Sequence, residues 1–461
     1  MQGNALVPLV MYLWIPVVLY IFTRFPPQRA LVVSITAGWL FLPLAEIKIL
    51  PGIPAYTKMA ATCYGILLAN IIYDFGRISS FQFGWLDIPM LIWCVCPFAS
   101  SITNDLGAYD GFSSTFSQVV TWGVPYFLGR IYLNNLAGLR QLAIGIFLGG
   151  LIYVPFCLYE IRFSTNIHGR VYGFQSEATG FLISLRYGGY RPAVFMQSGL
   201  MLGVWMMAAT LLGIVLWRAG IIKKIWNIPM SWLVVVLLIT FILVKATGAY
   251  MLLGLGLVIL FAGKWFRTAL VLWILIIGVS SYLYMGVNGT FTGQQREQIV
   301  TFVTNVAGPD RAQSLDFRFQ NEEILGNKAR QRIIFGWGGF GRNRVFDQYG
   351  KDISITDSLW IIAFGTNGVV GLISVTASLL LPVVSFCFRY PASSWSNPKV
   401  VPAAALALCL ALYLLDCVLN AMINPIFALT AGGISGLVLK EAETNKVTHR
   451  YQARQRQPRP N

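Results

Sequence analysis

Residues 357–387 read DSLWIIAFGTNGVVGLISVTASLLLPVVSFC, and this stretch is almost continuously apolar after its first two residues. A helix needs about 20 apolar residues to cross the hydrocarbon core of a bilayer. The run meets that length, and it lacks the apolar and polar alternation of a membrane β-strand. It therefore predicts a membrane-spanning helix that begins at a polar boundary.

The rest of the chain repeats this pattern. Of its 461 residues, 56% are hydrophobic and only 11% are charged, whereas soluble domains carry about 25% charged residues. We count about thirteen apolar runs of spanning length, at 5–23, 30–46, 59–74, 87–101, 112–129, 141–160, 192–217, 231–246, 248–263, 268–285, 357–387, 400–419 and 424–440. We expect an all-α polytopic membrane protein with about 12 or 13 transmembrane helices, the first of which stays in the membrane.

The cysteines do not suggest a metal site or a disulfide framework. All seven fall in or beside apolar runs, at 63, 94, 96, 157, 387, 409 and 417. Cys94 and Cys96 are too close for an easy disulfide, and no histidine cluster accompanies them for zinc. We expect them to be small buried hydrophobes.

The net charge of +16 orients the chain. Short basic connections fall on every second loop, at Arg24–Arg29, Arg77, Arg130 with Arg140, Arg218 with Lys223 and Lys224, Lys264 with Arg267, and Arg389 with Lys399. The positive-inside rule places that side in the cytoplasm, together with the basic tail 441–461, which we expect to be disordered.

The opposite side then receives two long loops. Residues 161–191 form an outer loop of the first transmembrane block, 1–285, and residues 286–356 form a large loop before the last block, 357–440. The large loop carries nine basic and seven acidic residues, and its length predicts internal structure. Ser314–Arg332 reads as an amphipathic helix with Leu315, Phe319 and Leu325 on its apolar face.

Arginines on this side run against the positive-inside bias, which makes them functional candidates. The guanidinium group never deprotonates and presents a planar fork of donors that matches a phosphate. The alternative is ordinary pairing with carboxylates, and Arg318 has i,i+4 spacing to Glu322.

Two of these arginines stand in recurrent surroundings. Arg191, in the stretch RPAVF, marks the junction of the first outer loop with a helix. Arg318, in the stretch DFRF, begins a helical segment that ends at the Gly336-Trp337-Gly338 turn.

The third place is the start of the opening stretch. Asp357-Ser358 is followed by nine residues and then by Gly368-Val369-Val370-Gly371. In these three places the chain resembles the O-antigen ligase and polysaccharide polymerase family of bacterial inner-membrane glycosyltransferases. The ligases of that family carry histidine where this chain has Asp357, so the aspartate favours a polymerase.

The resemblance implies a multi-pass protein of the bacterial inner membrane whose active site faces the periplasm. It implies an inverting transfer, without metal or cofactor, from a glycan on undecaprenyl pyrophosphate. Arg191 and Arg318 would hold the diphosphate, and Asp357 would orient or deprotonate the acceptor hydroxyl. Further contacts to phosphate or glycan would come from Lys245, Lys328, Arg330, Arg332, Trp337, Arg342 and Arg344. Expected partners are membrane lipid and other polysaccharide-assembly proteins, and nucleic acid is not expected.

Three functions remain open at this stage. A polymerase would lengthen O-antigen or exopolysaccharide, and a ligase would pass the glycan to the lipid A-core of lipopolysaccharide or to protein. A transporter or flippase is the rival from another class, although transporters usually carry charges at the membrane midplane or an internal repeat.

Several other polar residues have a less specific reading. We expect His168 to be a solvated loop histidine, with a role as base as the alternative, and Glu160 to pair with Arg162 or Arg170. Asp416 lies inside an apolar run, where a charge suggests function. The GxxG spacing of Gly368 and Gly371 predicts close helix packing, and Trp337 and Trp360 are candidates for stacking on a sugar.

Overall fold

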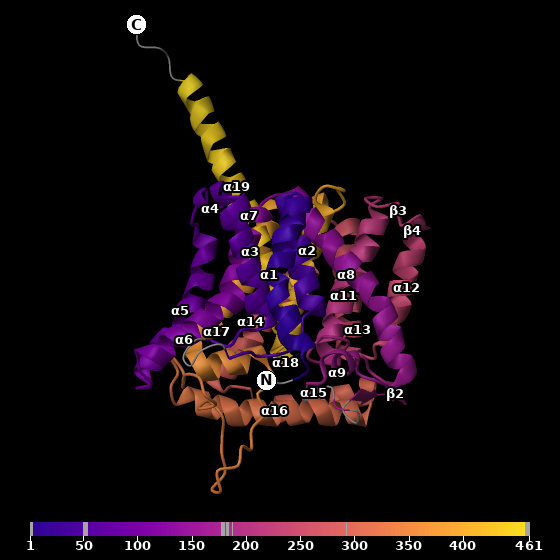
Figure 1. Cartoon of the computed structure of the whole chain (residues 1–461). Helices are drawn as coiled ribbons and strands as arrows, with labels where there is room; N and C mark the ends of the chain where they lie inside the picture. The colour runs from indigo at the N-terminus through magenta and orange to yellow at the C-terminus, as the bar shows by residue number, and fades with distance from the viewer. Residues whose placement is uncertain are drawn as a thin grey trace.

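The computed structural model describes residues 3–48, 54–176, 180, 184–186, 188–291 and 293–456, and their regular secondary structure is almost all helix (Figure 1). Within them, eight helical segments are long and apolar enough to cross a membrane. They are α1 (Leu6–Arg24), η1 with α5 (Trp85–Asp87 and Ile88–Thr103), α8 (Leu136–Phe163), α11 (Gly199–Arg218), α13 (Thr247–Trp265), α14 (Leu270–Asn288), α17 (Leu359–Arg389) and α18 (Val401–Leu419). The prediction of an all-α polytopic membrane protein is confirmed.

The remaining predicted runs fall on shorter or composite helices. These are α2 (Pro27–Phe41), α3 (Lys58–Tyr73), α12 (Met230–Leu243) and the first part of α19 (Pro425–Arg456). The run at 112–129 crosses three consecutive segments, α6 (Ala108–Gln118), a π-helix η2 (Val119–Gly123) and α7 (Val124–Tyr132).

The bundle has two unlike ends. At one end, which we call the tail end, the C-terminal part of α19 leaves the bundle, beside α4 (Phe75–Ser79) and the hairpin of β3 (Lys224–Ile225) and β4 (Ile228–Pro229) (Figure 1). The short connector η4 (Ala392–Ser394) follows α17. At the opposite end, the loop end, lie α15 (Gly293–Ala307), α16 (Pro309–Arg330), α9 (Ile167–Tyr172) and the antiparallel pair β1 (Leu185–Arg186) and β2 (Gly189–Tyr190). The two long loops therefore gather at one end, as expected.

The large loop contains the predicted amphipathic helix. It is α16, which begins at Pro309 and ends at Arg330, and the predicted apolar positions Phe319 and Leu325 are buried. In Figure 1 this helix lies across the loop end of the bundle.

The tail departs from its prediction. Residues 441–461 were expected to be disordered, but α19 continues to Arg456, and residues 457–461 lie outside the described residues. No glycine or proline occurs between Gly436 and Pro458, and the segment is rich in Glu, Ala, Lys, Gln and Arg, which favour the helix.

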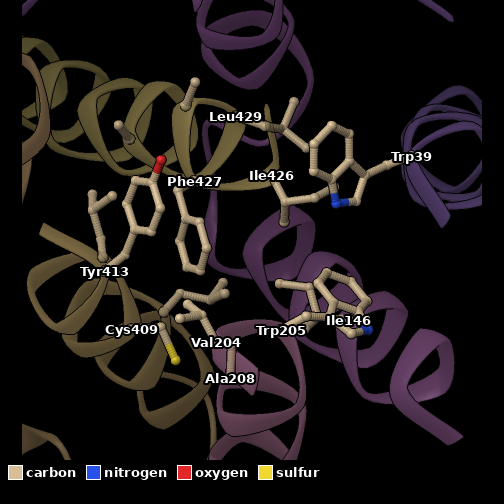
Figure 2. Packing of buried hydrophobic residues seen from close by; sticks show 14 of the residues in the cluster. Trp39, Ile146, Val204, Trp205, Ala208, Cys409, Tyr413, Ile426, Phe427 and Leu429 are labelled. Atoms are coloured by element: carbon tan, nitrogen blue, oxygen red, sulfur yellow. The ribbon is translucent and has the colours of Figure 1, made fainter. Parts of the chain in front are cut away.

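The centre of the bundle is formed by α11 and α18, whose apolar windows are each 89% buried, against 22% for α1. Figure 2 shows Tyr413 of α18 stacked on Phe427 of α19, with ring centroids 4.0 Å apart. Trp205 and Ala208 of α11 lie nearby in the same cluster. This packing fixes the loop-end termini of α11, α18 and α19, where the candidate site lies.

Candidate functional site

The connection between α18 and α19, residues 420–424, is not helical although it lies among buried residues. With Leu419 we call it the 419–424 connection. Arg318 Nη1 donates to the Leu419 carbonyl over 3.0 Å, and the Leu359 amide at the start of α17 donates to the Asn420 carbonyl over 3.1 Å. Ser198 Oγ, just before α11, lies 3.4 Å from Met422 Sδ. The start of α11, the start of α17 and the middle of α16 thus meet on one short stretch.

Arg191 reaches the same place through α11. Its side chain is 8% exposed and lies over Gly199, where an added Cβ would come within 2.8 Å of Arg191 Cγ. Only a glycine at position 199, the first residue of α11, leaves room for the side chain of Arg191. Ser198, the neighbour of Gly199, contacts the 419–424 connection.

Glu160 holds the backbone that follows Arg191. The Glu160 side chain is fully buried and accepts hydrogen bonds from the amides of Ile167, Ala193 and Val194 over 2.6, 2.8 and 2.9 Å. Val194 has a φ of 56°, which is rare for a β-branched residue. The expectation that Glu160 pairs with Arg162 or Arg170 is wrong. A carboxylate inside the protein is instead satisfied by the amides of a strained turn, and so it sets the course of the chain at Arg191.

Lys245, at the end of α12, joins this group. Its Nζ lies within 2.1 Å of the position that a Cβ on Gly189 would occupy, so its ammonium group rests against β2, two residues before Arg191. Lys245 and Arg191 are far apart in the sequence, so no local pattern indicates that they are neighbours. The structure brings both basic side chains to the hairpin of β1 and β2.

The guanidinium of Arg318 on α16 is held at the site by a backbone carbonyl rather than by a carboxylate. Its charge acts on Glu322 and on Asp416, yet among the described residues no ion pair joins it to either. The i,i+4 pairing with Glu322 is therefore wrong. The positive charge of Arg318 is oriented by the Leu419 carbonyl and remains available to an anion.

Glu322 has other partners. The Tyr282 hydroxyl donates to Glu322 Oε2 over 2.5 Å, and Trp360 Nε1 donates to Glu322 Oε1 over 3.0 Å. Burial raises the pKa of Glu322 above its ordinary range, and these hydrogen bonds act in the opposite direction. Trp360 is 5% exposed and committed to this contact, so its ring is not open for a sugar.

Asp416 lies one turn before the 419–424 connection. Its Oδ1 accepts a hydrogen bond from Asn420 Nδ2 over 3.0 Å, while its buried Oδ2 has no hydrogen-bond partner among the described residues. This leaves a carboxyl oxygen inside the site that can receive a proton or a donor group.

Asp357 stands two residues before α17, at the outer edge of the site. Its side chain is exposed and makes no hydrogen bond or ion pair with the residues that the structure describes. Leu359, two residues after Asp357, bonds to Asn420, so this carboxylate lies close in the chain to a contact with the 419–424 connection.

Gly368, the first glycine of the GxxG spacing, has a different role from the predicted helix packing. Gly368 breaks α17 with φ 66° and ψ −164°. The break leaves backbone groups of α17 without helical partners, and these groups bond to the segment 333–338 instead. The four hydrogen bonds run from Trp337 N to Gly365 O, Gly338 N to Thr366 O, Val369 N to Ile333 O and Val370 N to Ile334 O, over 2.7–3.3 Å. A Cβ on Gly336 would lie 2.6 Å from Gly368 N. The prediction of close helix packing is wrong for Gly368, because these glycines let two backbones interlock.

The interlock places a group of basic side chains. Lys328 Nζ lies 3.8 Å and Arg332 Cζ 4.6 Å from the centroid of the Trp337 ring. Arg332 Nη1 also donates to Asn104 Oδ1 over 2.5 Å, and Arg330 Nη1 donates to the Gly286 carbonyl over 2.8 Å. The ring of Trp337 thus receives cations, and the basic groups of this segment are oriented by neutral partners.

Two predicted contacts lie elsewhere. Arg342 and Arg344 are exposed, and Arg344 forms an ion pair of 2.8 Å with Asp352. Among the described residues, neither arginine forms a hydrogen bond or ion pair with the 419–424 connection.

His168 is buried rather than solvated, at 2% exposure. Its Nε2 accepts the Leu44 amide over 3.0 Å, and its Nδ1 lies 2.8 Å from the Phe174 carbonyl, which makes Nδ1 the protonated nitrogen. Burial lowers the pKa of His168. With both nitrogens engaged in holding the outer loop, His168 is a structural residue.

Sequence reasoning missed two features of this site. The predicted apolar runs ended at 419 and resumed at 424, and the amides of Asn420 and Asn424 are unusual in such a region, but nothing showed that Arg318 and Leu359 bond to this connection. Glu322 carried none, because its donors Tyr282 and Trp360 lie 40 and 38 residues away. No protein-family model and no curated protein matches the chain, so the site rests on its own geometry.

Proposed function

We propose that this protein is a glycosyltransferase that polymerises undecaprenyl-pyrophosphate-linked oligosaccharide repeat units. In this proposal the loop end faces the periplasm of a bacterial cell and the tail end faces the cytoplasm. The observation that carries the proposal is that Arg318 and the start of α17 bond to the 419–424 connection, while Arg191 packs over Gly199 beside Ser198, which contacts Met422. Arg191 and Arg318 are 127 positions apart in the sequence, and Arg318 and Leu359 at the start of α17 are 41 apart, so no local pattern joins them.

The arrangement suits departure of a diphosphate. The acceptor hydroxyl attacks the anomeric carbon of the donor glycan, and the bond from that carbon to the diphosphate oxygen breaks. The electron pair leaves with the diphosphate, whose growing charge is met by Arg191 and Arg318. Cations held in place before the reaction stabilise such charge without reorganisation. Asp357 takes the proton of the acceptor hydroxyl, and attack from the face opposite the diphosphate inverts the anomeric centre.

An apolar groove supports a donor with a long lipid chain. It lies between α14 and α17, has a volume of about 400 Å³, and is lined by residues such as Ile276, Leu283, Val369 and Leu380. At its loop end, Val287 of the lining follows Gly286, whose carbonyl accepts the hydrogen bond from Arg330. A polyprenyl tail in this groove would place its diphosphate among the basic side chains of the loop end.

The test is a transfer reaction with the protein in lipid nanodiscs and undecaprenyl-pyrophosphate-linked repeat units as the only substrate. We expect a ladder of lengthened glycans that is lost in Arg318→Ala and weakened in Asp357→Ala. Arg344→Ala is the matched control, because that arginine is paired with Asp352 away from the site. Product formed only after lipid A-core or protein is added would assign a ligase. No product with any acceptor would overturn the transferase and favour transport.

A further inference from the structure

A second basic pocket lies at the tail end of the bundle, on the opposite side of the protein from the candidate site. Its volume is about 420 Å³, within the range of small-molecule sites. Its polar lining comes from three separate parts of the chain: Arg77 and Gln82; Arg130, Asn134 and Asn135; and Lys440 of α19. Three of these side chains are basic, and no carboxylate is among the described residues that line the pocket.

Arg130 forms the rigid wall. Its Nε and Nη2 donate to the two carboxylate oxygens of Asp87 over 2.6 and 3.0 Å, and the two side chains are only 7% and 5% exposed. Tyr126 also donates to Asp87 over 2.9 Å. This bidentate pair ties the start of α5 to α7, so the pocket is built on fixed elements.

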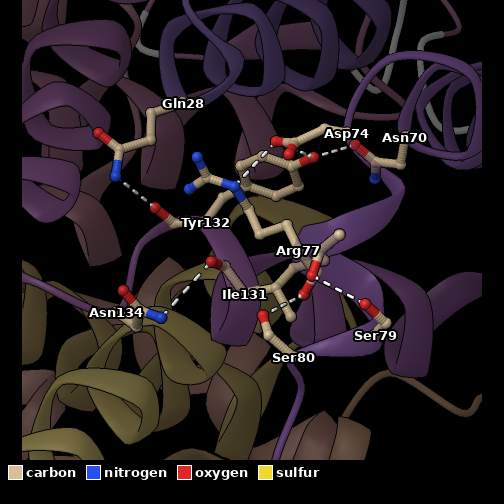
Figure 3. Close-up of polar contacts among 10 residues, drawn as sticks. Gln28, Asn70, Asp74, Arg77, Ser79, Ser80, Ile131, Tyr132 and Asn134 are labelled. Carbon is tan, nitrogen blue, oxygen red and sulfur yellow. Dashed lines mark hydrogen bonds and ion pairs between the residues drawn. The ribbon is translucent and has the colours of Figure 1, made fainter.

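Arg77 is the side chain with donors to spare. Its Nε bonds to Asp74 Oδ2 over 2.8 Å, and the guanidinium lies 4.9 Å from the centroid of the Tyr132 ring. Its two terminal nitrogens form no hydrogen bond with the residues that the structure describes. Figure 3 shows these nitrogens pointing away from Asp74. One carboxylate therefore orients the guanidinium and leaves its outer edge for a second anion, in a geometry that matches phosphate oxygens.

The basic side chains of the pocket and its neutral hydrogen-bond donors both suit the binding of such an anion. Asp74 and Asp87 lie behind Arg77 and Arg130, and the exposed Lys440 adds a third basic side chain to the lining of the pocket. The amides of Asn134 and Asn135 lie beside it, with Asn135 Nδ2 donating to Asn134 Oδ1 over 3.3 Å. Amides of this kind bind hydroxyl groups, so a phosphate with a short polar substituent fits both parts of the lining.

The surroundings indicate where this phosphate comes from. Ile72, Tyr73 and Phe75, directly before Arg77 in the chain, are 54%, 49% and 60% exposed. Large apolar side chains exposed at the end of a transmembrane helix face acyl chains or the interface of the bilayer. Basic pockets between transmembrane helices at this level are suited to lipid head groups. We propose that the tail-end pocket binds the phosphate-bearing head group of an anionic phospholipid.

Binding is tested with the full chain in a neutral detergent, by thermal unfolding during titration with phosphatidylglycerol. We expect phosphatidylglycerol to raise the Tm and phosphatidylcholine to leave it unchanged. Each of Arg77→Gln and Lys440→Gln should raise the apparent Kd roughly tenfold, the loss expected for one hydrogen bond to a charged group. Lys223→Gln is the matched control, since Lys223 is exposed at the same end outside the pocket.

Three results would overturn the proposal. The first is an equal rise in Tm with phosphatidylcholine, and the second is an unchanged rise with phosphatidylglycerol in the double variant of Arg77 and Lys440. The third is saturation by free glycerol phosphate at the same concentration as the lipid, which would assign a soluble phosphate ester as the ligand instead. Lys440→Gln keeps the test intact if Arg77→Gln fails to fold because Asp74 loses its partner. The readout needs no glycan donor, so it is independent of the proposed transferase activity.

Discussion

The arginines at the two ends of the bundle are held by different partners. At the tail end three pair with carboxylates: Arg77 with Asp74, Arg130 with Asp87 and Arg389 with Glu441, over 2.8, 2.6 and 2.9 Å. Arg140 is an exception at this end, since it bonds to the Ile221 carbonyl over 3.5 Å. At the loop end they bond to backbone carbonyls: Arg318 to Leu419, Arg330 to Gly286 and Arg332 to Thr103, over 3.0, 2.8 and 3.3 Å.

The difference has an electrostatic consequence. A carboxylate orients an arginine and cancels its charge, whereas a carbonyl orients it and leaves the charge in place. The tail end therefore uses arginine mainly to join helices. The loop end keeps positive charge at fixed positions, which is what a site for a diphosphate requires. Arg296 with Asp316 and Arg344 with Asp352 are the loop-end exceptions.

The largest effect is expected from removing a tail-end arginine with a structural role. Arg130→Ala leaves Asp87 buried without its partner, which costs about 3–5 kcal/mol for pairs of this kind. Thermal unfolding in detergent measures the loss. The double variant Asp87→Leu with Arg130→Met should recover most of it, because no buried charge remains. If Arg130→Ala melted at the same temperature as the wild type, the ion pair would not be what joins α5 to α7.

Removing a loop-end arginine should affect activity and spare stability. We expect Arg318→Ala to lower the rate of glycan transfer by about 10²–10³, the usual effect of one group that stabilises a leaving charge. Its melting temperature should stay close to that of the wild type, since Arg318 forms no ion pair with the described residues. A large fall in Tm with a proportional fall in activity would make Arg318 structural like Arg130.

The backbone interlock at the loop end is tested at Gly368. Alanine there meets a φ of 66° and places Cβ 2.2 Å from the Ile334 carbonyl oxygen. Strain of this kind costs about 1–3 kcal/mol before the clash is counted, so Gly368→Ala should lower the Tm. Gly278→Ala in α14 is the control, with open space around its Cβ, and it should be neutral or slightly stabilising. Equal melting of the two variants would contradict the interlock.

The smallest effect is a pH dependence that arises from the outer loop. Burial lowers the pKa of His168 below its ordinary 6.5, so the folded protein keeps this ring neutral while the unfolded chain takes up a proton. Stability from His168 is therefore present above pH 6.5 and is lost as the pH falls below it. We expect the Tm of His168→Gln to vary less than that of the wild type between about pH 8 and about pH 5. Parallel pH profiles would show that His168 is not the group responsible.

Much of the fold could be read from the chain without the structure. Long apolar runs such as 357–387 must be helical in a bilayer, because every backbone group has to be satisfied within the segment. The placement of both long loops opposite the tail followed from the basic connections, and α16 followed from the spacing of Phe319 and Leu325.

The tertiary structure alone decided which polar groups meet. Glu160 bonds to amides 33 and 34 residues away, and Arg318 bonds to a carbonyl 101 residues away. The break at Gly368 depends on a second backbone that approaches from the large loop. Hydropathy and charge are properties of single residues and their near neighbours, so the sequence by itself determined the helices and their sidedness. Hydrogen-bond partners depend on which helix ends pack together, and only the packed chain determined these.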